Sequence, residues 1–140
     1  MTIEMLAPAA ALALWSMIML VWMAGTRLPA LAKLDMPPEK TRGGRGSDLD
    51  GVLLDETQWK AHNYNHLMEQ PTAFYAVVIV LALVGGSQLD LILAWSYVGL
   101  RVAHSIWQAM INTIPVRLTL FLISSLILTA MAARALLATI

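Results

Sequence analysis

Residues 62–86 read HNYNHLMEQPTAFYAVVIVLALVGG, a stretch in which a polar segment runs directly into an apolar one. From Ala73 to Val84 the stretch is apolar throughout, and paired glycines follow it. Such a run is typical of a membrane-spanning helix. The polar half carries two His, two Asn and a Glu, with Pro71 at the junction. The stretch therefore predicts a membrane helix whose first turns are polar, and the chemistry of those turns becomes the central question.

The composition of the whole chain is that of a membrane protein. Of its 140 residues, 59% are hydrophobic and 13% are charged, and the mean hydropathy is +0.68. Soluble domains are about half apolar and about a quarter charged. The formal net charge of zero gives no global attraction for nucleic acid, so we expect no nucleic-acid partner. The absence of Cys excludes disulfides and a cysteine nucleophile, so any thiol chemistry would use a thiol brought by a ligand.

Four apolar segments are long enough to cross a bilayer: residues 5–25, 66–85, 89–109 and 116–136. Each is close to the ~20 residues that a ~30 Å hydrocarbon layer requires. None shows the apolar–polar alternation of a transmembrane strand. The first carries Glu4 before it rather than the Lys or Arg of a signal peptide, so we expect a retained anchor. The sequence thus predicts an all-α membrane protein, a four-transmembrane-helix bundle that forms one domain over residues 1–140.

Basic residues predict how the bundle is oriented. They are concentrated in the connection between the first two spans, residues 27–61: Arg27, Lys33, Lys40, Arg42, Arg45 and Lys60. The positive-inside rule therefore places this long loop in the cytosol and both termini on the non-cytosolic side. Arg134 lies near the far end of the last span, where it can snorkel to the opposite surface.

Polar side chains also lie within the predicted spans, where a charged group costs at least about 2.5–3.5 kcal/mol on insertion scales. In the third span, Arg101, His104 and Gln108 recur at i, i+3 and i+7, which places them on one helical face. Tyr97 lies one turn earlier on the same face. Arg101 is about 16 Å along the helix from Asp90, near the midplane of the bilayer.

A second polar face is predicted at the start of the second span. There His62, Asn65, His66 and Glu69 recur at i, i+3, i+4 and i+7. Counted from the far end of this span, Glu69 is about 24 Å deep, close to the level of His104 at about 21 Å. Two polar faces of opposite formal charge at matching depth are expected to meet inside the bundle. They predict a polar cavity that opens to the cytosol.

Two other interpretations stay open at this point. Glu69 and Arg101 could form a purely structural ion pair, although apolar packing would hold the helices with less desolvation. The pattern H-x-x-x-H-x-x-E formed by His62, His66 and Glu69 also has the spacing of metal ligands, with His104 available as a fourth. Such triples arise by chance near membrane interfaces, and we predict no metal site.

Two segments carry a resemblance to a known family. NHLMEQPTAFY (residues 65–75) and LRVAHSIWQ (100–108), together with the four spans and the long first loop, resemble the MAPEG family, the membrane-associated proteins of eicosanoid and glutathione metabolism. The resemblance covers essentially the whole chain and points to a bacterial cytoplasmic (inner) membrane. It implies a homotrimer with glutathione held as co-substrate between neighbouring subunits at the cytosolic side. The other implied partners are membrane lipid and a lipophilic small molecule.

The resemblance also implies roles for individual residues. Glutathione would contact six side chains: Arg27, Asn65, Glu69, Arg101, His104 and Gln108. Arg117, which opens the fourth span, would be catalytic by stabilising the thiolate. This is chemically coherent, because Arg binds carboxylates bidentately and a nearby positive charge lowers the pKa of a thiol.

The implied activity is that of a glutathione-dependent transferase or peroxidase acting on lipophilic electrophiles. The alternative is a non-catalytic trimeric scaffold, a lipid-binding protein or an accessory subunit of a larger complex. The orientation of Arg117 discriminates between them: if it points into the polar cavity, thiolate activation is feasible, and if it faces headgroups the alternative gains.

Overall fold

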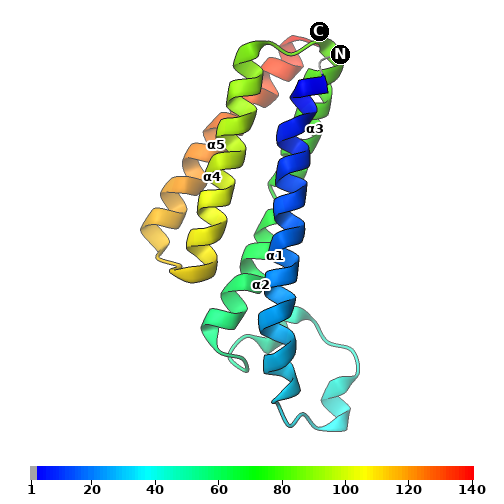
Figure 1. Cartoon of the computed structure of the whole chain (residues 1–140), viewed down its shortest axis with the longest axis vertical. Helices are drawn as coiled ribbons and strands as arrows, with labels where there is room; N and C mark the ends of the chain where they lie inside the picture. Colours follow the sequence, from blue (N-terminus) through cyan, green and yellow to red (C-terminus); the bar gives the residue numbers. More distant parts are fainter. Residues whose placement is uncertain (1–2) are drawn as a thin grey trace.

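The computed structural model describes residues 3–140, and every regular element in that range is helical. The elements are five α-helices and three short 3-10 helices: η1 (Ile3–Leu6), α1 (Ala7–Ala32), η2 (Pro38–Thr41), η3 (Gly46–Leu49), α2 (Asp55–Leu67), α3 (Pro71–Val84), α4 (Gln88–Met110) and α5 (Ile114–Leu137). Because α2 and α3 follow each other along one side of the molecule, the α-helices form four rods (Figure 1).

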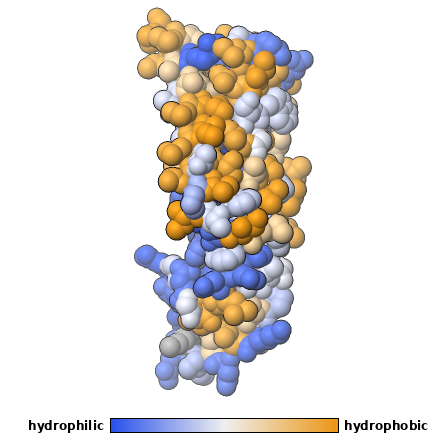
Figure 2. All heavy atoms as spheres, turned by 90° about the vertical axis from the view of Figure 1, so that its left-hand side faces the viewer, coloured by the Kyte–Doolittle hydropathy of each residue, from blue (hydrophilic) through white to orange (hydrophobic). Residues whose placement is uncertain are grey.

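Three of the four rods are long and apolar enough to cross a membrane: Ile3–Ala32, Asp55–Val84 and Ile114–Leu137. The fourth, α4, has 23 residues, but polar and charged side chains on its buried face lower its hydropathy. Its outer face is apolar, with Ile92, Trp95 and Ile106 exposed. Figure 2 shows apolar side chains over most of one face of the molecule, with hydrophilic ones gathered towards the end that holds the α1–α2 loop. The prediction of an all-helical membrane bundle is confirmed, and the crossing by α4 stays a prediction.

The second rod differs from the continuous helix that the sequence predicts. Helix α2 ends at Leu67, residues 68–70 form a turn, and α3 begins at Pro71. Proline has no N–H to continue the ladder and is well suited to the first turn of a helix, so Pro71 starts a new helix instead of extending the old one. The i, i+3, i+4, i+7 pattern therefore does not extend to Glu69. Its side chain is 68% exposed, although the sequence placed it inside the bundle.

Asn63 and Lys60 are two of the polar side chains that attach α2 to its neighbours. Asn63 is fully buried, and its Nδ2 donates to Ser105 Oγ on α4 at 2.7 Å. Lys60 Nζ donates to the Ala109 carbonyl at 3.2 Å and lies 5.6 Å from the centre of the Trp22 ring on α1. The last carbonyls of a helix have no partner within it, so Lys60 satisfies one of those at the end of α4. These contacts fix the height of α2 against α4.

An ion pair closes the opposite end of the bundle. Gly85 ends α3 in the left-handed conformation with φ 87°, and Ser87 then caps α4 together with Asp90. Arg134 on α5 reaches back to this turn, where its Nε donates to Asp90 Oδ1 at 2.5 Å and its Nη2 to Ser87 Oγ at 3.0 Å. Arg134 therefore binds α5 to the α3–α4 turn, a role beyond the snorkelling that the sequence suggested.

Replacing Arg134 with Ala should destabilise the protein by about 2 kcal/mol, because it leaves the buried Asp90 carboxylate without its charged partner. Thermal unfolding in detergent, followed by tryptophan fluorescence, measures the change. Arg134→Lys keeps the charge and should recover part of the loss. Equal stability of Arg134→Ala and the wild type would show that the pair contributes nothing.

Candidate functional site

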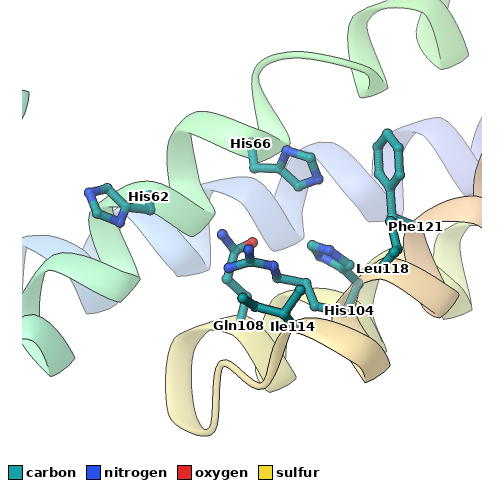
Figure 3. Close-up of a pocket in the computed structure, with 8 residues that line it drawn as sticks. His62, His66, His104, Gln108, Ile114, Leu118 and Phe121 are labelled. Atoms are coloured by element: carbon teal, nitrogen blue, oxygen red, sulfur yellow. The ribbon is translucent and has the colours of Figure 1, made fainter.

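A cavity of about 410 Å³ lies between α2, α4 and α5, near the α4–α5 turn (Figure 3). Its volume falls within the roughly 300–1,000 Å³ typical of small-molecule sites. All three histidines of the chain line it. The complete lining comprises His62, His66, His104, Gln108, Ile114, Arg117, Leu118 and Phe121. We refer to it below as the histidine cavity.

Each wall of the histidine cavity follows from helical spacing. His62 and His66 are one turn apart on α2, and His104 and Gln108 are one turn apart on α4. Figure 3 shows the His66 ring turned towards His104, whereas the His62 ring points the other way. The third wall, from α5, supplies Arg117 and mostly apolar side chains. The structure therefore brings together three of the predicted site residues, His104, Gln108 and Arg117, and adds His66 from the predicted face of α2.

Arg101 lies behind this cavity at the centre of a buried hydrogen-bond chain. Its side chain is 1% exposed, and its Nε donates to Tyr97 Oη at 3.1 Å. Tyr97 Oη in turn donates to Gln70 Oε1 at 3.2 Å, and Gln70 Nε2 donates to Ser125 Oγ at 2.7 Å. The chain connects α4, the α2–α3 turn and α5. It satisfies polar groups that would otherwise be costly at membrane depth.

His66 connects Arg101 to Glu69, and the contacts fix its tautomer. Arg101 Nη1 lies 3.3 Å from His66 Nε2, and a guanidinium can only donate, so this nitrogen is the acceptor. The proton is then on Nδ1, which donates to Glu69 Oε2 at 3.1 Å. Glu69 and Arg101 are therefore linked through a histidine. The direct meeting of these two charges that the sequence predicted is replaced by this relay.

Four predicted glutathione contacts do not line the histidine cavity: Arg101, which lies behind it, and Arg27, Asn65 and Glu69. Asn65 and Glu69 are exposed on the outer surface of α2 and the turn after it. The asparagine that faces the bundle is Asn63, two residues earlier. Arg27 lines a separate cavity in the α1–α2 loop, where its Nη2 donates to the Gly46 carbonyl at 2.5 Å.

Polar groups without hydrogen-bond partners lie in and behind the histidine cavity, and its lining has a cationic character. None of the described residues that line it is Asp or Glu, whereas Arg117 carries a positive charge. Among residues 3–140, neither ring nitrogen of His104 has a hydrogen-bond partner, and its ring centre lies 4.9 Å from that of His66. Gln108 Oε1 in the lining, and Arg101 Nη2 behind it, are buried without partners in the part of the chain that the structure describes. Buried polar groups are normally satisfied, so such a set suits a polar, anionic ligand.

A metal interpretation has no geometric support in the part of the chain that the structure describes, where no three His, Asp or Glu side chains could hold one ion. His62 instead bonds Asp50 of the loop, with 2.9 Å between Nε2 and Oδ1. Hydrogen bonds from Gln58 and His62 hold the pKa of the Asp50 carboxyl below its ordinary value. His62 therefore anchors the loop beside the mouth of the cavity.

Sequence reasoning did not assign Asn63, Gln70 and Phe121 to the site region. Gln70 stands directly before Pro71, where a break in the helix could have been expected, and a break would have redirected the polar side chains around it. Phe121 lies in an apolar run of α5 and gave no signal. It contacts both His66 and Arg101: the ring centres of Phe121 and His66 are 5.5 Å apart, and Arg101 Cζ lies 5.6 Å from the Phe121 ring centre.

The fold and this site define a multi-helix integral membrane protein with a polar, cationic cavity towards one end. A comparison with protein families shows that the MAPEG family matches residues 5–137, nearly the whole chain. The chain belongs to the MAPEG family. No curated protein and no solved structure matches it.

Tyr97→Phe should destabilise the protein by about 1–3 kcal/mol, because it removes the hydroxyl that Arg101 Nε and Gln70 Oε1 both use. Tyr64→Phe is the matched control, since Tyr64 makes no side-chain hydrogen bond among the described residues, and its effect should stay within about 0.5 kcal/mol. Thermal unfolding in detergent compares the two. If Tyr97→Phe were as stable as the control, the hydrogen-bond chain through Tyr97 would contribute nothing to stability.

Proposed function

We propose that this protein binds glutathione at the histidine cavity and uses its thiol against lipophilic electrophiles, as a transferase or peroxidase. The observation that supports this most directly is the position of Arg117. It lines the same cavity as His104 and Gln108, which is the orientation that thiolate activation requires. Membership of the MAPEG family supports the proposal independently.

The chemistry follows from the lining. Glutathione has two carboxylates and a thiol, and the thiolate is its nucleophilic form. Arg117 would favour the thiolate by charge, and its Nη1 is held in place by Asn112 Oδ1 at 2.5 Å. The ring nitrogens of His104 and the amide of Gln108 would contribute directional hydrogen bonds to the peptide. The thiolate would then attack the electrophile, forming a carbon–sulfur bond as the leaving group departs.

A lipophilic substrate would reach this site from the lipid. Ile114 and Leu118 line the cavity and are also 66% and 51% exposed on the outer surface of α5. An apolar molecule dissolved in the bilayer could therefore approach the thiolate without crossing water. We propose that this end of the bundle lies on the cytosolic side of the membrane, with α4 as the fourth span, following the distribution of Lys and Arg. From the family resemblance, we propose that the membrane is a bacterial inner membrane.

The exposed predicted contacts fit a site shared between subunits. Asn65 and Glu69 are exposed on the surface of a single chain. In an oligomer they could contact a glutathione molecule that is bound in the histidine cavity of a neighbouring subunit. We therefore propose a homotrimer, in which each glutathione contacts two subunits.

The alternative is a non-catalytic trimeric scaffold, lipid-binding protein or accessory subunit. The observation that favours it is that Arg101 hydrogen-bonds Tyr97 and His66 and does not line the cavity, although its Nη2 has no partner among the described residues. In that case Arg101 and its partners would stabilise the bundle without serving a ligand.

Glutathione binding by calorimetry on detergent-purified protein tests the main proposal. The wild type should bind at millimolar glutathione or below, and Arg117→Ala should weaken binding about tenfold or more through loss of a charged hydrogen bond. Lys33→Ala removes an exposed positive charge outside the cavity and should bind like the wild type. No heat from the wild type at millimolar glutathione would eliminate the transferase proposal.

The trimer is tested separately. Native mass spectrometry in detergent should give three times the 15.3 kDa chain mass. Glu69→Ala should then weaken glutathione binding without changing that mass, because Glu69 serves a site and is not needed for assembly. A monomeric mass would contradict the shared site, while leaving binding by Arg117 to be judged by calorimetry alone.

A further inference from the structure

A second cavity, of about 900 Å³, lies within the α1–α2 loop beside the end of α1, at the cyan end of the molecule in Figure 1. We call it the loop cavity. Arg27 of α1 and Arg42 and Arg45 of the loop line it. Two aspartates, Asp35 and Asp48, line it too, and Asp48 Oδ2 is engaged by the backbone N–H of Arg45 at 2.6 Å. Three arginines against two aspartates leave the lining with a net positive charge.

The loop backbone is folded closely around Arg27. Its Nη2 donates to the Gly46 carbonyl, and a Cβ at Gly46 would lie only 3.1 Å from Arg27 Nη1. Arg27 Nε is nevertheless buried with no partner among the described residues. The site therefore holds one arginine in a fixed orientation with a donor left over. Arg42 and Arg45 make no side-chain hydrogen bond or ion pair within the described chain and are exposed.

The rest of the lining is apolar. Leu31 and Leu34 at the end of α1, and Leu49 and Val52 from the loop, complete the walls. Val52 is 54% exposed, and its neighbour Leu54 is 80% exposed. Large apolar side chains exposed next to a basic cavity are unfavourable in water, and they are typical of a surface that touches lipid.

The position of the loop cavity along α1 agrees with this. Arg27 is two residues, or about 3 Å of helical rise, beyond the predicted end of the first span at Gly25. The headgroup layer on each side of a bilayer is roughly 5–7 Å thick. The predicted span therefore puts the guanidinium of Arg27 at the depth of lipid phosphates, on the side where basic residues are concentrated.

We propose that the loop cavity binds a phosphate group, and that its source is the headgroup of an anionic phospholipid. Arginine forks match phosphate oxygens, and the apolar wall suits the glycerol and upper acyl region, which a free phosphate lacks. The site is separate from the histidine cavity and does not depend on glutathione binding.

Native mass spectrometry of the full chain in detergent, titrated with phosphatidylglycerol, tests this. The wild type should retain phosphatidylglycerol in preference to phosphatidylcholine of the same acyl length. Each of Arg42→Gln and Arg45→Gln should weaken retention about fivefold, and the double variant roughly 25-fold. Lys33→Gln is the matched control, because it removes an exposed positive charge near the end of α1 that does not line the cavity.

A separate titration with inorganic phosphate distinguishes the source. The proposal expects no retained phosphate at concentrations where the lipid binds. Phosphate binding that Arg42→Gln and Arg45→Gln abolish would overturn the lipid as source while keeping the phosphate site. Retention of phosphatidylglycerol that is equal in the double variant and in Lys33→Gln, or equal to that of phosphatidylcholine, would overturn the proposal. Arg42 and Arg45 are exposed and make no side-chain pair with any residue that the structure describes, so the variants should keep the wild-type helical content by circular dichroism.

Discussion

The arrangement of this bundle depends on one constraint, the burial of the Arg101 guanidinium between helices. A charge buried between helices must be hydrated, paired or hydrogen-bonded. No carboxylate among the described residues is in hydrogen-bonding contact with it; Tyr97, His66 and the rings of Tyr97 and Phe121 surround it. The protein therefore stabilises the cation with neutral acceptors and aromatic faces. Such contacts do not neutralise the positive charge, whereas an ion pair with Glu69 would.

The break that Pro71 makes between α2 and α3 serves the same constraint. A continuous helix would carry the side chains of residues 68–70 around at 100° per residue, whereas the turn before Pro71 presents Gln70 inwards and Glu69 outwards. Gln70 has both a donor and an acceptor, so it can connect Tyr97 to Ser125 without adding charge. A neutral amide at this position costs less to bury than a carboxylate would. The helix break at Pro71 thus lets Gln70 complete the hydrogen-bond chain between Tyr97 and Ser125.

The sequence predicts the architecture well, because length and apolarity are properties of whole segments. The polar face of α4 is also predictable, since Arg101, His104 and Gln108 lie on one uninterrupted helix and are all buried. The face of α2 was predicted wrongly at its end, because the periodicity argument assumed one helix through Pro71. Gln70 could not be placed for the same reason. Asn63 lies within α2, before the break, and there the predicted face included the exposed Asn65 in place of the buried Asn63. Arg134 was interpreted as snorkelling because its partner, Asp90, is 44 residues away in the sequence.

The two cavities differ in a way that bears on the class of ligand each can take. The histidine cavity is built on three helices, whose packing holds Arg117, His104 and Gln108 in defined positions. Sites on rigid elements can position a reacting group, whereas the loop cavity is formed largely by residues between helices. A loop can adapt to a headgroup that needs only charge and depth, but it is poorly suited to aligning a thiolate with an electrophile. The family resemblance links Arg27 to glutathione. Within one chain, however, Arg27 is hydrogen-bonded to the Gly46 carbonyl and lines the loop cavity, apart from the histidine cavity.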